Sequence, residues 1–232
     1  MKSGFHHRHN FSSGETLAKA LADRVAADLN SAIAHNGQAV LALSGGSTPR
    51  RFLTLLSERD VDWPQVTLTL VDERWVPATH ERSNEKLVRD FLMKGVAAMA
   101  TFVSLYCDTS TPDQGLERIS ANLPDQIDIA ILGMGPDGHT ASFFPNGDNL
   151  EAAIDLGNTQ SVISMRAEDA GEPRMTLTLS KLLGANHLYL HIEGREKADV
   201  LAKAFDEGPT NDVPVRSFIN QTRRPLEIFW AP

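Results

Sequence analysis

The sequence predicts an α/β fold, namely a mostly parallel, twisted sheet with helices on both faces, of the Rossmann-like type. Short apolar runs typical of buried strands alternate with amphipathic helical segments. Polar, often glycine-containing segments follow several of these runs, where a parallel strand would meet a helix. The 232 residues are 41% hydrophobic, enough for an ordinary buried core. No long Gly/Ser linker or repeat interrupts the pattern, so we expect residues 1–232 to form a single domain.

The first long helix is expected to begin near Ser12, which has capping-box spacing with Glu15. Apolar residues then recur every fourth position over 17–33, and Gly37 follows with the chemistry of a C-cap. The remaining helices are expected from Pro49 onward and at 84–93, 112–122 and 195–205. Strands are expected at 38–43, 66–71, 102–105, 127–132, 161–165, 175–179, 187–193 and 226–230.

Composition limits the function. A net charge of −8 argues against a nucleic-acid surface, although one basic pocket could still bind a small anion. Cys107 is the single cysteine, which excludes an intrachain disulfide and fits a reducing compartment. No apolar segment approaches the ~20 residues of a membrane span. We therefore expect a soluble, cytoplasmic protein without nucleic-acid or membrane partners. We expect the histidine-rich segment 1–11 to be polar and mobile.

The motif at 44–49, Ser-Gly-Gly-Ser-Thr-Pro, follows the first predicted strand and opens a helix. Gly45 and Gly46 let the backbone approach a ligand, and the helix N-terminus offers N–H groups to an anion. Ser44 and Ser47 add hydroxyl donors. The endings of a Walker A loop and of GxGxxG are absent. A phosphate site and a simple strand-to-helix turn explain this motif equally well.

The motif at 72–77, Asp-Glu-Arg-Trp-Val-Pro, also follows an apolar strand. Asp72 and Arg74 could hold a sugar hydroxyl and an anion, respectively. A surface ion pair is the simpler explanation of the same pattern.

The third motif, at 133–145, is Gly-Met-Gly-Pro-Asp-Gly-His-Thr-Ala-Ser-Phe-Phe-Pro. Its glycines imply an unusual backbone that presents Asp137 and His139 at the end of a strand. A histidine there can act as a general base near neutral pH. A turn histidine or a metal pair is the alternative, but Asp-x-His without a third ligand is weak evidence for metal.

Two cations complete the candidate site. Arg174 precedes one predicted strand, and Lys197 lies in a strand-to-helix turn. Either could neutralise a phosphate, and either could be a solvated surface charge. Ligands of open α/β sheets lie outside the carboxyl ends of the strands, so we expect these motifs to converge on one pocket.

With these motifs the chain resembles the 6-phosphogluconolactonase family over nearly its whole length. The likeness rests on Leu-Ser-Gly-Gly-Ser-Thr-Pro at 43–49, the motif at 72–77 with Ser-Asn at 83–84, the motif at 133–145, Arg-Met-Thr-Leu-Thr at 174–178 and Gly-Arg-Glu-Lys at 194–197. The stretch 167–172 departs from the resemblance, because it is less rich in proline.

The resemblance implies a fold shared with glucosamine-6-phosphate deaminases and ribose-5-phosphate isomerases. It implies hydrolysis of 6-phospho-D-glucono-1,5-lactone to 6-phospho-D-gluconate in the oxidative pentose phosphate pathway. We expect this reaction to need no metal or cofactor. It makes His139 the base and Asp137 its neighbour, with Asp72 and Arg74 lining the pocket. The ligand and phosphate contacts that it implies are Gly45, Gly46, Ser47, Arg174 and Lys197.

Two other functions compete with this one. The first is an aldose–ketose isomerase or amino-sugar-phosphate deaminase of the same fold. The deaminases carry a glutamate five residues after the equivalent histidine, where this chain has Phe144. A non-catalytic sugar-phosphate sensor that regulates transcription would need a DNA-binding element. The N-terminal ~40 residues offer one helix and no basic helix-turn-helix.

Overall fold

The computed structural model describes residues 6–232, and its framework is a seven-stranded sheet in which every neighbouring pair is parallel. The strand order is β1-β10-β9-β6-β2-β3-β5. The strands are β1 (His6–Asn10), β2 (Ala39–Leu43), β3 (Val66–Leu70), β5 (Thr101–Phe102), β6 (Ile129–Leu132), β9 (His187–Glu193) and β10 (Leu226–Ala231). Strands β2 and β6 are buried along their whole length, as expected of parallel strands covered on both faces.

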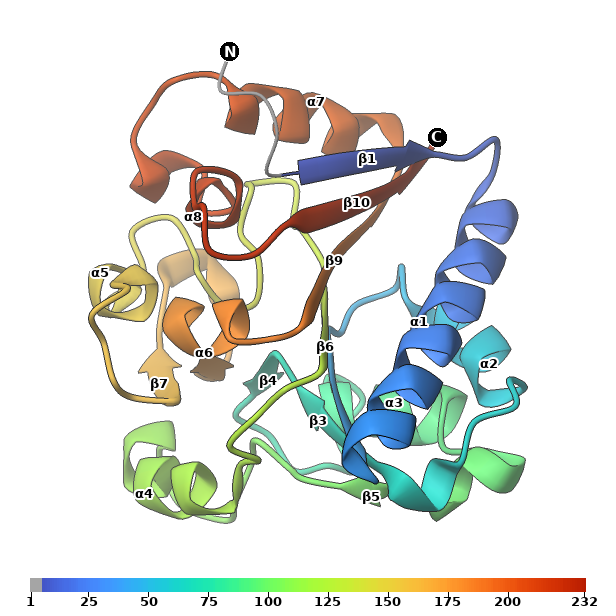
Figure 1. Ribbon diagram of the computed structural model, residues 1–232. Helices are drawn as coiled ribbons and strands as arrows, with labels where there is room; N and C mark the ends of the chain where they lie inside the picture. Colours follow the sequence, from blue (N-terminus) through green and yellow to red (C-terminus); the bar gives the residue numbers. More distant parts are fainter. Residues whose placement is uncertain (1–5) are drawn as a thin grey trace.

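Helices cover both faces of this sheet, which confirms the predicted fold class (Figure 1). One side carries α1 (Gly14–Asn36), α2 (Arg50–Ser57) and α3 (Asn84–Phe91). The other carries α4 (Pro112–Asn122), α5 (Leu150–Ile154), α6 (Leu179–Leu183), α7 (Arg195–Phe205) and α8 (Arg216–Ile219). Short 3-10 turns are η1 (Trp63–Gln65), η2 (Gly95–Met99), η3 (Glu168–Ala170) and η4 (Thr210–Asp212). No helix within residues 6–232 combines the length and apolar character that crossing a membrane requires.

Helix α1 packs the predicted apolar stripe against the sheet, and Leu17, Leu21 and Leu29 are fully buried. Its N-cap is Ser13, which accepts from the backbone of Thr16, so the expected capping box at Ser12 was one residue out of place. The helix ends at Gly37 with a left-handed φ of 76°, as expected.

The expectation of a mobile N-terminus was wrong for His6–Asn10, which forms β1; residues 1–5 lie outside the described residues. Strand β1 pairs in parallel with β10, and the His9 ring lies 4.7 Å from that of Phe229. Pairing satisfies backbone groups that β10 would otherwise expose at the sheet edge.

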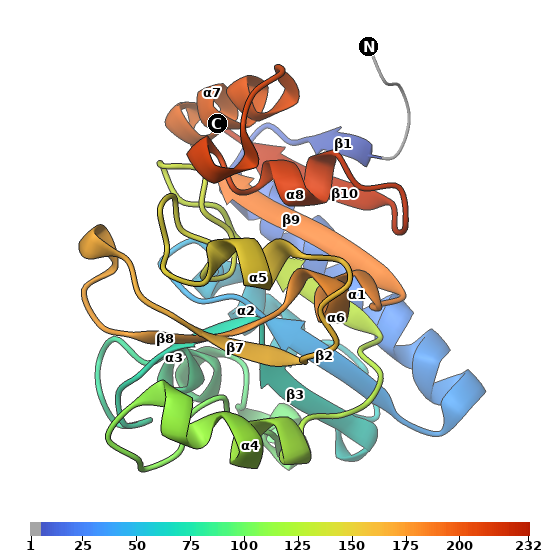
Figure 2. The same ribbon diagram turned by 90° about the vertical axis from the view of Figure 1, so that its left-hand side faces the viewer.

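A second, three-stranded antiparallel sheet was not predicted. It consists of β4 (Asp72–Arg74), β8 (Arg174–Leu177) and β7 (Val162–Met165), in the order β4-β8-β7. Figure 2 shows β7 and β8 between α4 and α5. Strand β4 continues the chain of β3 after one residue, so the small sheet carries Asp72 and Arg74 beyond the end of the main sheet.

Candidate active site

A pocket lies where the strand order of the main sheet reverses. From β2 the chain continues to β3 and β5, whereas from β6 it continues to β9 on the other side. The two strand ends meet so closely that a Cβ added to Gly133 would lie 3.5 Å from Ser44 Oγ. Open parallel sheets bind ligands at such a switch point.

The pocket has a volume of about 200 Å³. It is lined by Ser44, Gly45, Gly46, Ser47, Thr48, Pro49, Asp72, Arg74, Asn84, Gly133, Met134, Gly135, His139, Ala141, His191 and Lys197. Eight of the ten residues singled out in the sequence are in this lining. Of the other two, Asp137 contacts His139, and Arg174 lies outside the pocket.

The loop at 44–49 needs glycine at two successive positions. A Cβ on Gly45 would lie 1.7 Å from Asn84 Oδ1, and Gly46 has a left-handed φ of 95°. Helix α2 follows with Pro49 as N-cap and no side-chain capping bond. Its first N–H groups and the positive end of its dipole therefore face the pocket without a competing side-chain acceptor.

Lys197, in the first turn of α7, brings a cation to this loop. Its Nζ donates to Thr48 Oγ1 over 3.3 Å, although the two residues lie 149 positions apart. Partial burial lowers the pKa of Lys197, against the opposing effect of Glu193 and Glu196. The loop and Lys197 together have the donors and the charge that an anion site requires, and we call them the phosphate end of the pocket (44–49 and Lys197).

His139 and Asp137 form a close pair, and His139 lines the same pocket. His139 Nδ1 lies 2.5 Å from Asp137 Oδ1, which also accepts from the backbone N–H of His139 at 3.1 Å. Burial raises the pKa of Asp137, but the bonds from His139 outweigh it and hold that pKa below its ordinary value. A carboxylate on Nδ1 favours the tautomer with its proton there, so that Nε2 keeps a free lone pair.

The loop that carries this pair has no room for a side chain at Gly135 and adopts left-handed backbone at two positions. A Cβ on Gly135 would lie 2.2 Å from His139 Cε1, and Gly138 has a left-handed φ of 81°. Ala141, a non-glycine residue in the pocket lining, also has a left-handed φ of 50°. Such backbone persists only when its surroundings hold it, and it is typical of functional loops. We call His139, Asp137 and this loop the catalytic end.

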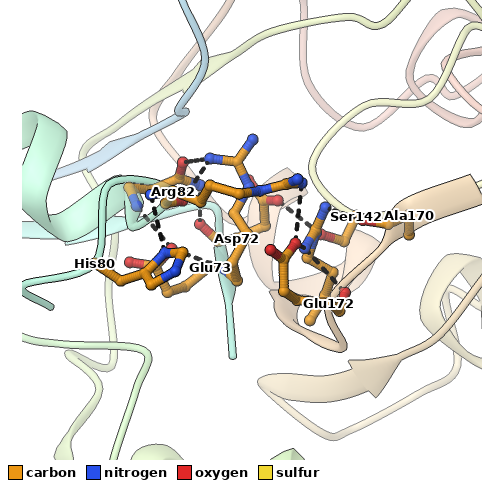
Figure 3. Close-up of polar contacts among 10 residues, drawn as sticks. Asp72, Glu73, His80, Arg82, Ser142, Ala170 and Glu172 are labelled. Atoms are coloured by element: carbon orange, nitrogen blue, oxygen red, sulfur yellow. Dashed lines mark hydrogen bonds and ion pairs between the residues drawn. The ribbon is translucent and has the colours of Figure 1, made fainter. Parts of the chain in front are cut away.

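Asp72 is almost completely buried at the start of β4 and is held by a second motif. Its Oδ2 accepts from Ser142 Oγ at 2.6 Å, so the loop at 133–145 positions this carboxylate as well as His139 (Figure 3). The motifs at 72–77 and 133–145, distant in sequence, thus meet through a hydrogen bond.

Arg74 is held by Asn84, which sequence reasoning did not single out as a site residue. Arg74 Nη1 donates to Asn84 Oδ1 at 2.5 Å and to the carbonyl of Arg82 at 2.9 Å. Asn84 Nδ2 in turn donates to the carbonyl of Asp72 at 2.8 Å. Asn84 therefore fixes one side of the pocket and packs against Gly45.

Glu73 lies behind this arrangement and is fully buried. Its carboxylate accepts from the backbone N–H groups of Arg74, Asn84 and Glu85 at 2.7, 2.7 and 2.8 Å and from Ser83 Oγ at 2.9 Å. Burial raises the pKa of Glu73 to about 7, against the effect of these four donors. Glu73 thereby ties the start of α3, and Asn84 with it, to β4.

The structure does not place Arg174 at the phosphate end. It is 4% exposed on β8, and its guanidinium donates to the carbonyls of Ala170 and Glu172 at 2.6 and 2.9 Å and lies over the ring of Phe144. Burial lowers its pKa, and the charge of Asp72 opposes this. The 167–172 stretch therefore folds back onto the guanidinium and accepts from both of its Nη atoms.

His191 is the second lining residue that the sequence did not reveal. It belongs to β9, which reads as an ordinary buried strand. The signal was the pair of polar residues His191 and Glu193 at the carboxyl end of that strand, where ligands bind. Within residues 6–232, no group of three or more His, Cys, Asp or Glu side chains is arranged to hold a metal ion.

Known proteins resemble this chain over nearly its whole length. The family described as glucosamine-6-phosphate isomerases/6-phosphogluconolactonase matches residues 12–230. The 6-phosphogluconolactonase of Rhizobium meliloti (strain 1021) is 50% identical over 97% of this chain and 98% of its own. That of Pseudomonas putida is 40% identical over 97% and 92%. The crystal structure of a 6-phosphogluconolactonase from Shewanella baltica OS155 is similar with a TM-score of 0.94, at 35% identity and 98% coverage of both chains.

Proposed function

The chain belongs to the glucosamine-6-phosphate isomerase/6-phosphogluconolactonase family, and from this premise we propose that it hydrolyses 6-phospho-D-glucono-1,5-lactone to 6-phospho-D-gluconate with His139 as general base. The reaction belongs to the oxidative pentose phosphate pathway. Sequence identity of 50% to a protein named 6-phosphogluconolactonase supports the lactone hydrolase activity. We place the reaction in the cytoplasm, and a single free cysteine fits that compartment.

The observation that carries the mechanism is the His139–Asp137 pair, in the same pocket as an anion site. The substrate has its phosphate at one end and its electrophilic carbonyl carbon at the other. A pocket that combines the phosphate end with a separate basic imidazole matches that distribution.

In the first step, His139 Nε2 removes a proton from a water molecule as its oxygen attacks the lactone carbonyl. A bond forms between the water oxygen and C1, and the electrons of the C=O double bond move to the carbonyl oxygen. Asp137 keeps the proton on Nδ1 and stabilises the imidazolium that results. Positioned general-base catalysis of this kind contributes about 10²- to 10⁴-fold.

In the second step, the tetrahedral intermediate collapses and the bond between C1 and the ring oxygen breaks. His139 returns its proton to the departing ring oxygen, and the new carboxylic acid ionises in solution. Arg74, fixed by Asn84, is our candidate donor to the oxyanion. Because no step requires a Lewis acid, the mechanism uses neither metal nor cofactor.

The other residues bind and orient the substrate. We assign the phosphate to the loop at 44–49 and Lys197 rather than to Arg174, which lies outside the pocket lining and donates to the carbonyls of Ala170 and Glu172. Asp72 keeps one carboxylate oxygen, Oδ1, for a sugar hydroxyl, since Ser142 donates to the other. Binding energy from the phosphate then positions the carbonyl for attack.

The chain lacks a carboxylate that the isomerase/deaminase alternative would need. Phe144 stands where the resemblance places a deaminase glutamate, and its ring packs 4.6 Å from that of His139. A regulatory sensor would be expected to shift bulk DNA in a gel, which this proposal does not expect.

The test is acid release from freshly generated 6-phosphoglucono-1,5-lactone above its uncatalysed background, with and without EDTA. We expect EDTA-insensitive turnover that falls about 10²- to 10⁴-fold in kcat in His139→Ala, with phosphate affinity retained. No turnover above background would contradict the lactonase assignment. Turnover that EDTA abolishes would keep the reaction and replace the mechanism.

A further inference from the structure

One pocket residue has no part in this mechanism. His191 is only 2% exposed, yet it lines the pocket. It lies on the strand next to β6, where the register continues from Leu132 paired with Leu190, so that His191 is beside Gly133. A buried imidazole is costly to keep in a core unless its ring nitrogens are used.

The ring of His191 is held from two sides. Its Nε2 is 3.2 Å from Glu193 Oε1, and the ring of Phe52, in the first turn of α2, packs against it in a T-shaped arrangement at 5.9 Å between ring centroids. Within residues 6–232, Nδ1 forms no hydrogen bond. Since Glu193 accepts from Nε2–H, Nδ1 is the nitrogen left for a ligand.

The charged groups around His191 come from several elements. Glu193 is on the same strand, Lys197 is on α7, and Arg51 of α2 faces Glu193. Burial lowers the pKa of His191, Glu193 raises it, and Lys197 lowers it. Asp72, Arg74 and His139 line the same pocket. In the empty pocket the imidazole is therefore neutral at neutral pH.

We propose that His191, held by Glu193, is a further recognition residue at the phosphate end, and that it takes up a proton when a dianion binds there. The protonated ring donates Nδ1–H to the anion and Nε2–H to Glu193. Neutral His191 presents a lone pair at Nδ1 and repels a dianion. The pocket therefore prefers dianionic ligands most strongly at mildly acidic pH. This assignment rests on the proposed function for the identity of the natural anion.

The sign of the pH dependence follows from linkage. A bound dianion raises the pKa of His191 above its value in the empty pocket. Affinity therefore increases as pH falls through the pKa of the bound state, and it levels off below the pKa of the free state. Between these two pKa values, binding is accompanied by net proton uptake.

Inorganic sulfate is the probe, because it stays a dianion throughout this range and so contributes no protons of its own. Calorimetric titration at about pH 6 and about pH 8, in buffers of different ionisation enthalpy, measures both Kd and proton uptake. For wild type we expect up to one proton taken up and about tenfold tighter binding at the lower pH. For His191→Gln we expect most of this uptake and of this pH dependence to be lost.

Two further variants make the result specific. His187→Gln removes a histidine on the same strand whose side chain is 38% exposed and outside the pocket, and it should behave as wild type. Glu193→Gln should reduce proton uptake without removing His191, and it provides the test if His191→Gln fails to fold. Wild-type uptake in the His191 variant, or none in wild type, would overturn the assignment.

Acid release from the lactone on the same preparations keeps the two proposals separate. Turnover without sulfate-linked proton uptake would overturn only the role of His191. Proton uptake without turnover would leave that role standing and contradict the lactonase proposal.

Discussion

The phosphate end of the pocket consists mainly of backbone groups, whereas the catalytic end consists of side chains. At the phosphate end, backbone forms the surface: Gly45 and Gly46 let the loop turn, and the start of α2 supplies N–H groups. At the catalytic end, side chains hold side chains, with Asp137 on His139 at 2.5 Å. Backbone sites hold a ligand, whereas paired side chains control protons. Changes at the catalytic end should therefore lower kcat, and changes at the phosphate end should raise KM.

The largest effect short of removing His139 is expected for Asp137→Asn. The amide can donate to Nδ1, which favours the tautomer whose Nε2 lacks a lone pair, and it does not stabilise the imidazolium. We expect kcat to fall roughly 10²- to 10³-fold with KM little changed. Asp125→Asn, an exposed aspartate outside the pocket, is the control in the same steady-state assay. An unchanged kcat would mean that Asp137 does not serve His139.

Gly45→Ala tests where the two ends meet. The new methyl group would overlap Asn84, which holds Arg74, so the change should disturb both binding and oxyanion stabilisation. Overpacking of about 1–3 kcal/mol predicts a loss in kcat/KM of roughly ten- to hundredfold, shared between kcat and KM. Gly157→Ala, whose Cβ would make ordinary contacts from 3.4 Å, is the matched control. An effect on KM alone would show that the two ends are independent.

Lys197→Ala should affect only the phosphate end. Loss of one charge-assisted contact predicts a KM about tenfold higher with kcat within about threefold of wild type. Lys203→Ala removes an exposed lysine from the same helix and should leave both constants unchanged. If kcat falls as much as KM rises, the binding and catalytic ends are not separable.

The same contrast explains how much of the site could be predicted from sequence. Glycine patterns after apolar strands reveal backbone sites, because few other residues tolerate those conformations. They led to the loop at 44–49 and to His139, and both lie in one pocket.

Contacts between distant side chains leave no such pattern. Asn84 opens a helix like any polar residue, and only the fold brings its amide to Arg74. The contacts of Arg174 are equally hidden, because nothing in the sequence shows that Ala170 and Glu172 present carbonyls to it. The pairing of β1 with β10 and the small sheet that contains β4 are likewise long-range, and local periodicity does not encode them.

Glu73 gives the smallest expected effect on turnover, because it contacts Asn84 but not the ligand. Glu73→Gln should lower kcat/KM about two- to fivefold, since an amide placed among four donors loosens Asn84. Glu117→Gln, exposed on α4, is the control.

The pH dependence of the free energy of unfolding tests the protonation of Glu73 more directly than turnover does. The pKa of Glu73 is raised from 4.5 to about 7 by burial, so its protonated form is favoured by folding. That contribution to the free energy of unfolding is present below the unfolded pKa and is lost as pH rises through about 7. Urea unfolding at about pH 5 and about pH 8 should therefore show wild type losing stability relative to Glu73→Gln as pH rises. A constant difference between the two proteins would mean that the four donors keep Glu73 ionised at both pH values, and that its hold on Asn84 does not vary with pH.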